Sequence, residues 1–153
     1  MKRTTIIEAI IFLYAVLFIY TGISKLIDFS AFRESIAESS MLTPFASLIA
    51  WTVPIIEFAI ILLLITPRWR LKGLYVTLIL MSIFTIYVIA LLIFSPTLPC
   101  SCGGIIQHLS WTQHIVFNCF FIVLAIWGIS LQKRENKVQR ITWHIHEHKA
   151  LSS

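Results

Sequence analysis

Four long apolar stretches dominate the sequence and constrain its fold more than any other feature. They cover about residues 5–27, 44–66, 73–95 and 111–131. About 20 apolar residues in a helix are enough to cross a bilayer, where only helices and closed barrels satisfy every backbone hydrogen bond. The sequence therefore predicts an all-α integral membrane protein, built as a bundle of four transmembrane helices.

The composition also indicates a protein that is embedded in a lipid bilayer. Of the 153 residues, 58% are hydrophobic and 12% are charged, and a soluble domain of this size could not bury so much apolar surface. The first stretch is too long, and too poor in small residues, to be a cleaved signal peptide. We expect one transmembrane domain over residues 1–132. A basic cytoplasmic tail follows over 133–153, predicted as a frayed continuation of the last helix and then mobile chain.

The basic residues predict how the bundle is oriented. In a four-span arrangement, ten of the twelve Lys and Arg residues fall on one side of the membrane, and only Lys25 and Arg33 fall on the other. Because Lys and Arg beside spans are retained in the cytoplasm, both termini and the turn at residues 67–70 are predicted to be cytoplasmic. The loop before the fourth span then faces the periplasm of a bacterial inner membrane. The net charge of +5 follows from this asymmetry and from anionic lipid, so it indicates no nucleic-acid partner.

A second, shorter helix is predicted between the first two spans. Within residues 28–43, Phe29, Phe32 and Ile36 recur at helical spacing, opposite charged side chains. This pattern favours a short amphipathic helix that lies on the periplasmic surface of the membrane. An ordinary polar connector is the alternative.

Two cysteines stand one residue apart on the polar break before the fourth span, in the sequence Cys100-Ser101-Cys102-Gly103-Gly104. A disulfide between positions i and i+2 is strained, because bridged Cα atoms usually lie about 4.4–6.8 Å apart and an extended tripeptide reaches or exceeds that limit. So small a ring also removes little entropy from the unfolded chain, which makes it a poor structural staple. A strained, exposed disulfide is typical of thiol–disulfide exchange, and the glycines leave the sulfurs open to a partner's thiolate.

Other interpretations of the pair stay open, and so do the groups that would tune it. The cysteines could be two thiols without chemistry, or a copper or zinc site with His108 as third ligand. For exchange, a nearby cation lowers the pKa of the attacking thiol, and Lys25 at the outer end of the first span is one such cation. A lysine at this depth can instead extend to lipid phosphate without a protein partner. His108 could carry protons, since histidine titrates near physiological pH.

Glu57 is the strongest second signal, because an ionisable side chain deep in a span is costly and normally faces the bundle interior. Pro54 lies three residues before it and is expected to kink the helix beside the carboxyl group. We expect either a pocket for quinone or proton transfer, or a structural hydrogen bond from a protonated carboxyl to another helix. The third span offers Ser82, Thr85 and Tyr87 for such a bond.

The two most distinctive motifs resemble those of a known family. The first span ends in YTGISKL over residues 20–26, and the loop before the fourth span carries CSCGG over residues 100–104. With four spans, these motifs resemble the MauE/DoxX group of membrane proteins over about residues 5–131. The resemblance implies action with a periplasmic thioredoxin-like partner in forming or maintaining disulfides, in a role analogous to that of vitamin K epoxide reductase. The positions that it would carry over are Cys100, Cys102, Gly22 and Lys25.

Two functional hypotheses from different classes follow. In the first, Cys100 and Cys102 exchange electrons between a thioredoxin-like protein and a membrane acceptor, for which quinone is the candidate; the direction of electron flow stays open. In the second, the chain is a non-enzymatic accessory subunit that scaffolds other membrane subunits, and the cysteine loop is a docking surface. A metal-handling membrane protein is a third option, and it predicts copper or zinc bound through Cys102.

Overall fold

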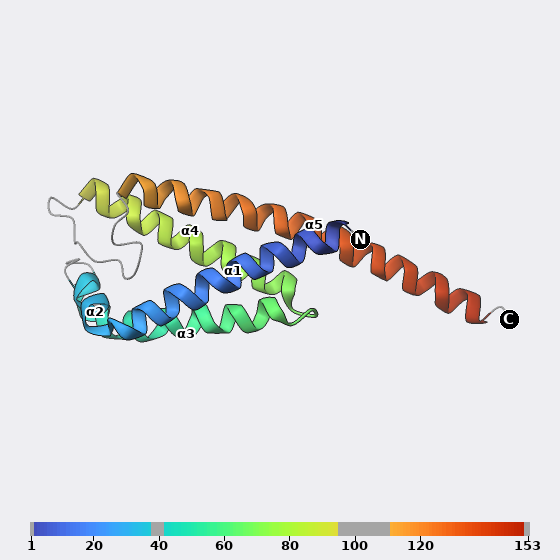
Figure 1. Cartoon of the computed structure of the whole chain (residues 1–153), viewed down its shortest axis with the longest axis horizontal. Coiled ribbons are helices and arrows are strands. Elements are labelled where there is room, and N and C mark those ends of the chain that lie inside the picture. Colours follow the sequence, from blue (N-terminus) through green and yellow to red (C-terminus); the bar gives the residue numbers. More distant parts are fainter. Residues whose placement is uncertain (1, 38–41, 95–110, 152–153) are drawn as a thin grey trace.

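A computed structural model describes residues 2–37, 42–94 and 111–151, and every regular element in them is helical. Figure 1 shows four long helices that lie side by side, with one short helix at the end of the bundle. The elements in chain order are α1 (Lys2–Ile27), α2 (Phe29–Ala37), the 3-10 turn η1 (Thr43–Phe45), α3 (Ala46–Ile65), α4 (Arg70–Phe94) and α5 (Trp111–Leu151).

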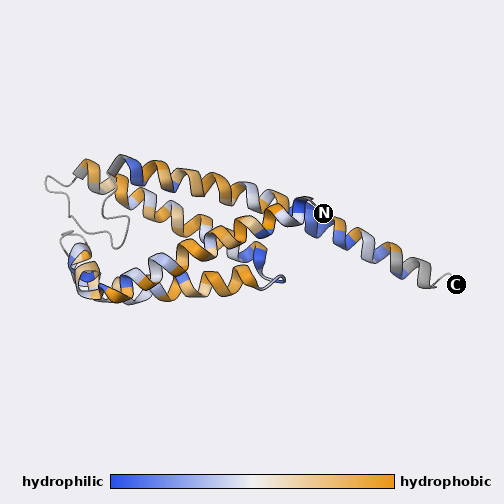
Figure 2. Ribbon diagram, in the orientation of Figure 1, coloured by the Kyte–Doolittle hydropathy of each residue, from blue (hydrophilic) through white to orange (hydrophobic). Residues whose placement is uncertain are grey.

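The four predicted spans correspond to α1, α3, α4 and α5, so the predicted fold class is confirmed. Each of these helices contains a segment that is long and apolar enough to cross a membrane, with mean hydropathy between 2.1 and 2.6. Figure 2 shows apolar residues along all four, whereas hydrophilic residues gather at α2, at the α3–α4 turn and along the far part of α5. Such a chain is a multi-pass membrane protein, because only lipid can cover so much apolar surface.

The four long helices form a closed ring in which each one packs against two others. α1 packs on α3 and α5, and α4 packs on the same two helices. The N-terminus and the α3–α4 turn lie at one end of the bundle, called here the turn end, and α2 lies at the other, the α2 end (Figure 1). The main apolar core, which includes Tyr14, Ile60, Leu74 and Phe121, belongs to the half nearer the turn end.

The predicted short helix between the first two spans is present as α2. Its apolar side chains do not lie free: Ile36 is buried with Ala46 and Ala50 of α3, and Phe29 and Phe32 pack around them. The ring of Phe29 also contacts that of Trp51, with centroids 4.7 Å apart and the ring planes tilted by 43°. The amphipathic pattern therefore reports contact with α3, which fixes α2 across the end of the bundle.

α5 is much longer than the span predicted for it. It continues without a break from Trp111 to Leu151, and its last turns extend beyond the bundle at the turn end (Figure 1). The predicted continuation of the fourth span beyond residue 132 is therefore present, and it is helical as far as Leu151. Polar residues such as Gln132, Lys133 and Glu135 are good helix formers, and Gln132 donates to Asn136 one turn on at 2.9 Å. They keep the helix regular after its apolar span ends.

Gly73 provides a test of how closely α3 and α4 must pack. A Cβ atom at this position would lie 3.1 Å from the Cβ of Leu63 and from the backbone nitrogen of Leu64, which cannot move aside. Gly73→Ala should therefore separate the α3–α4 hairpin and cost about 1–3 kcal/mol. The control is Gly128→Ala, whose Cβ would meet side-chain carbons of Ile10 and Leu74 at an ordinary 3.4 Å. Thermal unfolding in detergent should show a lower melting temperature for the first variant only, and equal melting of both would contradict this packing.

Candidate functional site

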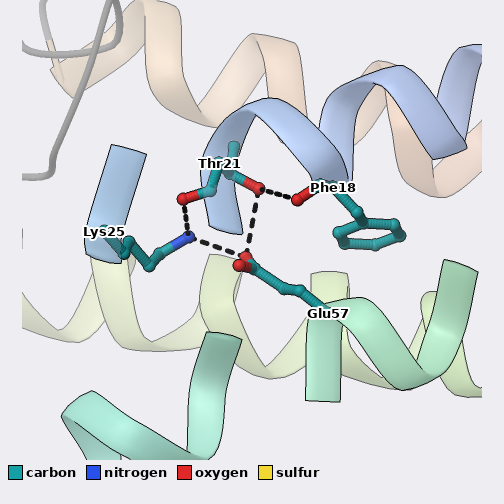
Figure 3. Close-up of polar contacts among 4 residues, drawn as sticks. All are labelled: Phe18, Thr21, Lys25 and Glu57. Carbon is teal, nitrogen blue, oxygen red and sulfur yellow. Dashed lines mark hydrogen bonds and ion pairs between the residues drawn. The ribbon is translucent and has the colours of Figure 1, made fainter. Parts of the chain in front are cut away.

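A buried ion pair joins α1 to α3 in the half of the bundle nearer the α2 end. The Lys25 ammonium nitrogen lies 2.6 Å from Oε1 of Glu57, and the two side chains are only 15% and 6% exposed. Figure 3 shows the two side chains reaching toward each other from neighbouring helices. At this distance the contact is a charge-assisted hydrogen bond as well as an ion pair, which is the strong form of both.

Thr21 completes the site from the same face of α1. Its hydroxyl donates to Oε1 of Glu57 at 3.1 Å, and its backbone carbonyl accepts from Lys25 Nζ at 3.4 Å (Figure 3). Residues four apart lie on one face of a helix, so the spacing of Thr21 and Lys25 lets both reach one carboxyl group. The ammonium group also lies 5.8 Å from the centre of the Phe32 ring of α2. Three helices thus hold the lysine head in place.

Gly22 allows the two helices to approach at this point. A Cβ atom on it would lie 3.3 Å from Oε2 of Glu57 and 3.3 Å from the ring of Phe58, both tighter than ordinary contact. Because glycine has no side chain, the backbone of α1 can pass directly over the carboxyl group. The T-G-x-x-K pattern of residues 21–25 therefore acts together: Thr21 and Lys25 donate to the Glu57 carboxyl group, and Gly22 lets α1 approach it.

The structure shows which groups Lys25 and Glu57 contact. In the part of the chain that the structure describes, every hydrogen bond to the Glu57 carboxyl group comes from α1. Two of the three expected partners on the third span, Ser82 and Thr85, donate instead to carbonyls of their own helix. The interpretation of Lys25 as a lysine that reaches lipid unaided was also wrong. Thr21 was not predicted, although its position four residues before a lysine in a span was the available signal.

The predicted cysteines and His108 lie outside the described residues. Cys100, Cys102 and His108 belong to the segment that connects α4 to α5. The helix ends on either side of this segment lie at the α2 end, which is also the end of α1 that carries Lys25 (Figure 1). The third cysteine, Cys119, is a free thiol exposed on the outer surface of α5. It faces away from the ion pair in the bundle interior.

Comparison with known proteins gives one family. Residues 3–131 match the sequence model of the family described as methylamine utilisation protein MauE. The match covers all four spans and includes the T-G-x-x-K pattern, Glu57 and both cysteines of the connecting segment. Neither the curated proteins nor the solved structures contain a match to the chain.

The ion pair predicts a specific pattern of stabilities. Lys25→Met should destabilise the protein by about 3–5 kcal/mol, because it leaves the Glu57 carboxylate buried without a cation. The double variant Lys25→Met/Glu57→Leu should recover most of that loss, since replacing a whole buried pair with apolar side chains is often neutral. Chemical unfolding in detergent measures both, with Lys72→Met, at an exposed position, as control. A double variant as unstable as the single one would show that the pair does not form.

Proposed function

The chain belongs to the MauE family of methylamine utilisation proteins, and we propose that it works in the membrane as a thiol–disulfide exchange protein. The reactive groups of this proposal are Cys100 and Cys102, which stand in the segment between α4 and α5. Support comes from the spacing of the two thiols. A disulfide between them would be strained, which suits thiol–disulfide exchange better than stabilisation of the fold. The partner is a periplasmic thioredoxin-like protein, and the cysteine segment faces it from the outer side of a bacterial inner membrane.

The exchange reaction balances without any further reagent. A thiolate of the partner attacks the sulfur of Cys102, the Cys100–Cys102 bond breaks, and Cys100 leaves as a thiolate that takes up a proton. The second thiol of the partner then attacks the mixed disulfide and releases Cys102. Two electrons pass from the partner to the cysteine pair, and the same steps in reverse would reduce the partner.

Continued turnover in the oxidising direction needs a membrane electron acceptor, for which we propose a quinone. The two cysteine thiols lose two electrons and two protons as their disulfide forms again, and the quinone gains the same number to become a hydroquinone. Quinones dissolve in the bilayer, so they reach a protein whose four long helices are surrounded by lipid.

The ion pair is proposed to serve this reaction as a proton-transfer and tuning site. One observation carries the assignment: Lys25 and Glu57 form a buried polar site in the half of the bundle where α4 ends and α5 begins, the two helices that the cysteine segment connects in sequence. Ionisable groups buried in a membrane usually mark proton or substrate pathways. Glu57 would hold and release the proton, Lys25 would stabilise its carboxylate, and His108 would carry protons at the mouth of the site.

Thiol trapping in native membranes tests the exchange reaction. The wild-type pair should shift between reduced and oxidised forms when dithiothreitol or quinone is added, as read from the mass added by an alkylating reagent. In Cys100→Ser, the Cys102 thiolate can still attack the disulfide of an oxidised partner and release one partner thiolate; the mixed disulfide should then accumulate, because Cys100, which would resolve it, is missing. Cys119→Ser, which removes the exposed thiol of α5, is the matched control and should behave as wild type. A pair locked in one state under every challenge, with no mixed disulfide, would favour the accessory-subunit hypothesis.

Glu57→Gln tests the proton-transfer role separately. The amide keeps the size of the side chain and an oxygen that accepts from Thr21, so the fold should persist. Reoxidation of the cysteine pair by quinone should slow at least tenfold, since a positioned acid or base typically contributes more than that. The control, Thr77→Val, removes a buried hydroxyl from the apolar half of the bundle and should leave the rate unchanged. Equal rates for wild type and Glu57→Gln would reduce Glu57 to a structural role.

A further inference from the structure

The interior of the bundle near the α2 end contains more buried polar side chains than the ion pair requires. His114 and Asn118 of α5 are only 6% and 3% exposed, and Thr85 of α4 is 6% exposed. His114 and Asn118 are one helical turn apart on the face of α5 that also carries Phe121 of the apolar core. Thr85 satisfies its hydroxyl at the Met81 carbonyl of its own helix, whereas Nδ2 of the buried Asn118 has no hydrogen-bond partner in the part of the chain that the structure describes, and such a group inside a membrane is costly.

The packing of α1 against α5 places His114 at the height of Thr21, the α1 residue that donates to Glu57. The Tyr14 hydroxyl donates to the carbonyl of Phe121, and the two rings meet edge to face with centroids 5.4 Å apart. Thr21 follows Tyr14 by seven residues along α1. His114 precedes Phe121 by seven residues along α5, which runs antiparallel to α1. Both lie about 10 Å from the tyrosine contact toward the α2 end, at a rise of 1.5 Å per residue. Asn118 lies between that level and the apolar core.

The packing of α4 against α5 places Thr85 at the height of Asn118. A Cβ atom on Gly128 of α5 would touch Leu74 of α4 at 3.4 Å, so these two residues are level. Thr85 follows Leu74 by eleven residues, and Asn118 precedes Gly128 by ten. Each of the four long helices therefore contributes to one polar layer, defined by Thr21, Lys25, Glu57, Thr85, His114 and Asn118.

Two buried atoms of this layer have no hydrogen-bond partner among the residues that the structure describes. One is the donor Nδ2 of Asn118, and the other is the acceptor Oε2 of Glu57. An unpaired buried donor or acceptor costs about 1–3 kcal/mol, so such groups in a native protein usually meet a ligand or water. The layer lacks one acceptor for Asn118 and one donor for Glu57.

We propose that the polar layer is the binding site of the quinone that reoxidises the cysteine pair. The inference rests on the proposed function, and it identifies the site and chemical class of its electron acceptor. The carbonyl oxygen of a quinone is the acceptor that Asn118 needs, and the hydroxyl of the hydroquinone is the donor that Glu57 needs. A neutral ring suits the site, because Lys25 and Glu57 already balance each other's charge.

The layer also gives the protons of the reaction a destination. Two electrons and two protons leave the cysteine thiols and convert the quinone to its hydroquinone, with no other oxidant. The Thr21–Lys25–Glu57 group lies in the same layer as Asn118, so the carboxyl group can hold a proton beside the bound ring. The apolar core around Tyr14 and Phe121 closes the site on the turn side, which keeps the ring in the half of the bundle that carries the cysteine segment.

Binding of a decyl-substituted benzoquinone to the full chain in lipid nanodiscs tests the site. Quenching of tryptophan emission, corrected with protein-free nanodiscs, gives the dissociation constant. Asn118→Leu removes the donor and should raise that constant at least tenfold, and Asn118→Ala should do the same if leucine disturbs the packing. Thr77→Val, which removes an unpaired buried hydroxyl outside the layer, should change it less than twofold. Wild-type binding that does not saturate, or an unchanged constant in both Asn118 variants, would overturn the proposal and leave water as the occupant.

A Cys100→Ser/Cys102→Ser variant separates this inference from the proposed function. It cannot exchange disulfides, yet it should bind the quinone as tightly as wild type, because neither cysteine belongs to the layer. Retained binding in a wild-type protein that fails the trapping experiment would refute the exchange reaction and leave the site in place. A protein that exchanges disulfides but does not bind the quinone would refute the site alone.

Discussion

The structure depends on the rule that a charge inside a membrane must find an opposite charge within the protein. The membrane interior offers no water to solvate a charge. The desolvation cost of Glu57 on α3 and Lys25 on α1 is therefore offset only when the two side chains pair. Their contact fixes which faces of the two helices meet, and Gly22 favours it, because a Cβ there would crowd the carboxyl group at 3.3 Å. α2 follows directly from α1 and packs on α3, so the position of this short helix depends on the same contact.

The bundle divides along its length into an apolar half and a polar half. Toward the turn end, residues such as Ile60, Leu74 and Phe121 pack into a continuous core, and the Tyr14 hydroxyl ties α1 to α5 at its border. Toward the α2 end, the helices α3, α4 and α5 bury Glu57, Thr85, His114 and Asn118, and α1 adds the half-buried Thr21 and Lys25. The apolar half supplies stability through dispersion and close packing. The polar half is the part of a membrane bundle in which chemistry is expected, and it includes the end of α4 and the start of α5.

The sequence predicted the helices well and their mutual contacts poorly. The spans and α2 are strong local signals, since hydropathy and helical spacing are read from consecutive residues. Glu57 and Lys25 stood out singly because each is an ionisable residue in or beside an apolar span. Their pairing was not predicted, and the hydrogen bonds first expected for Glu57 were assigned to the wrong helix. The length of α5 was also underestimated, because a polar helix outside the membrane carries no hydropathy signal.

The sequence by itself determined that this chain is a four-span membrane protein of a recognisable family, with two close thiols and a few polar residues that the bilayer does not tolerate alone. Only the tertiary structure decided which of those residues meet. Thr21 and Lys25 reach Glu57, and the Tyr14–Phe121 contact sets His114 at the height of Thr21. The physical reason is that hydropathy belongs to each span separately, whereas a contact between spans depends on the rotation and register of two packed helices. Those are set by side chains such as Tyr14 and Gly22 at the interfaces.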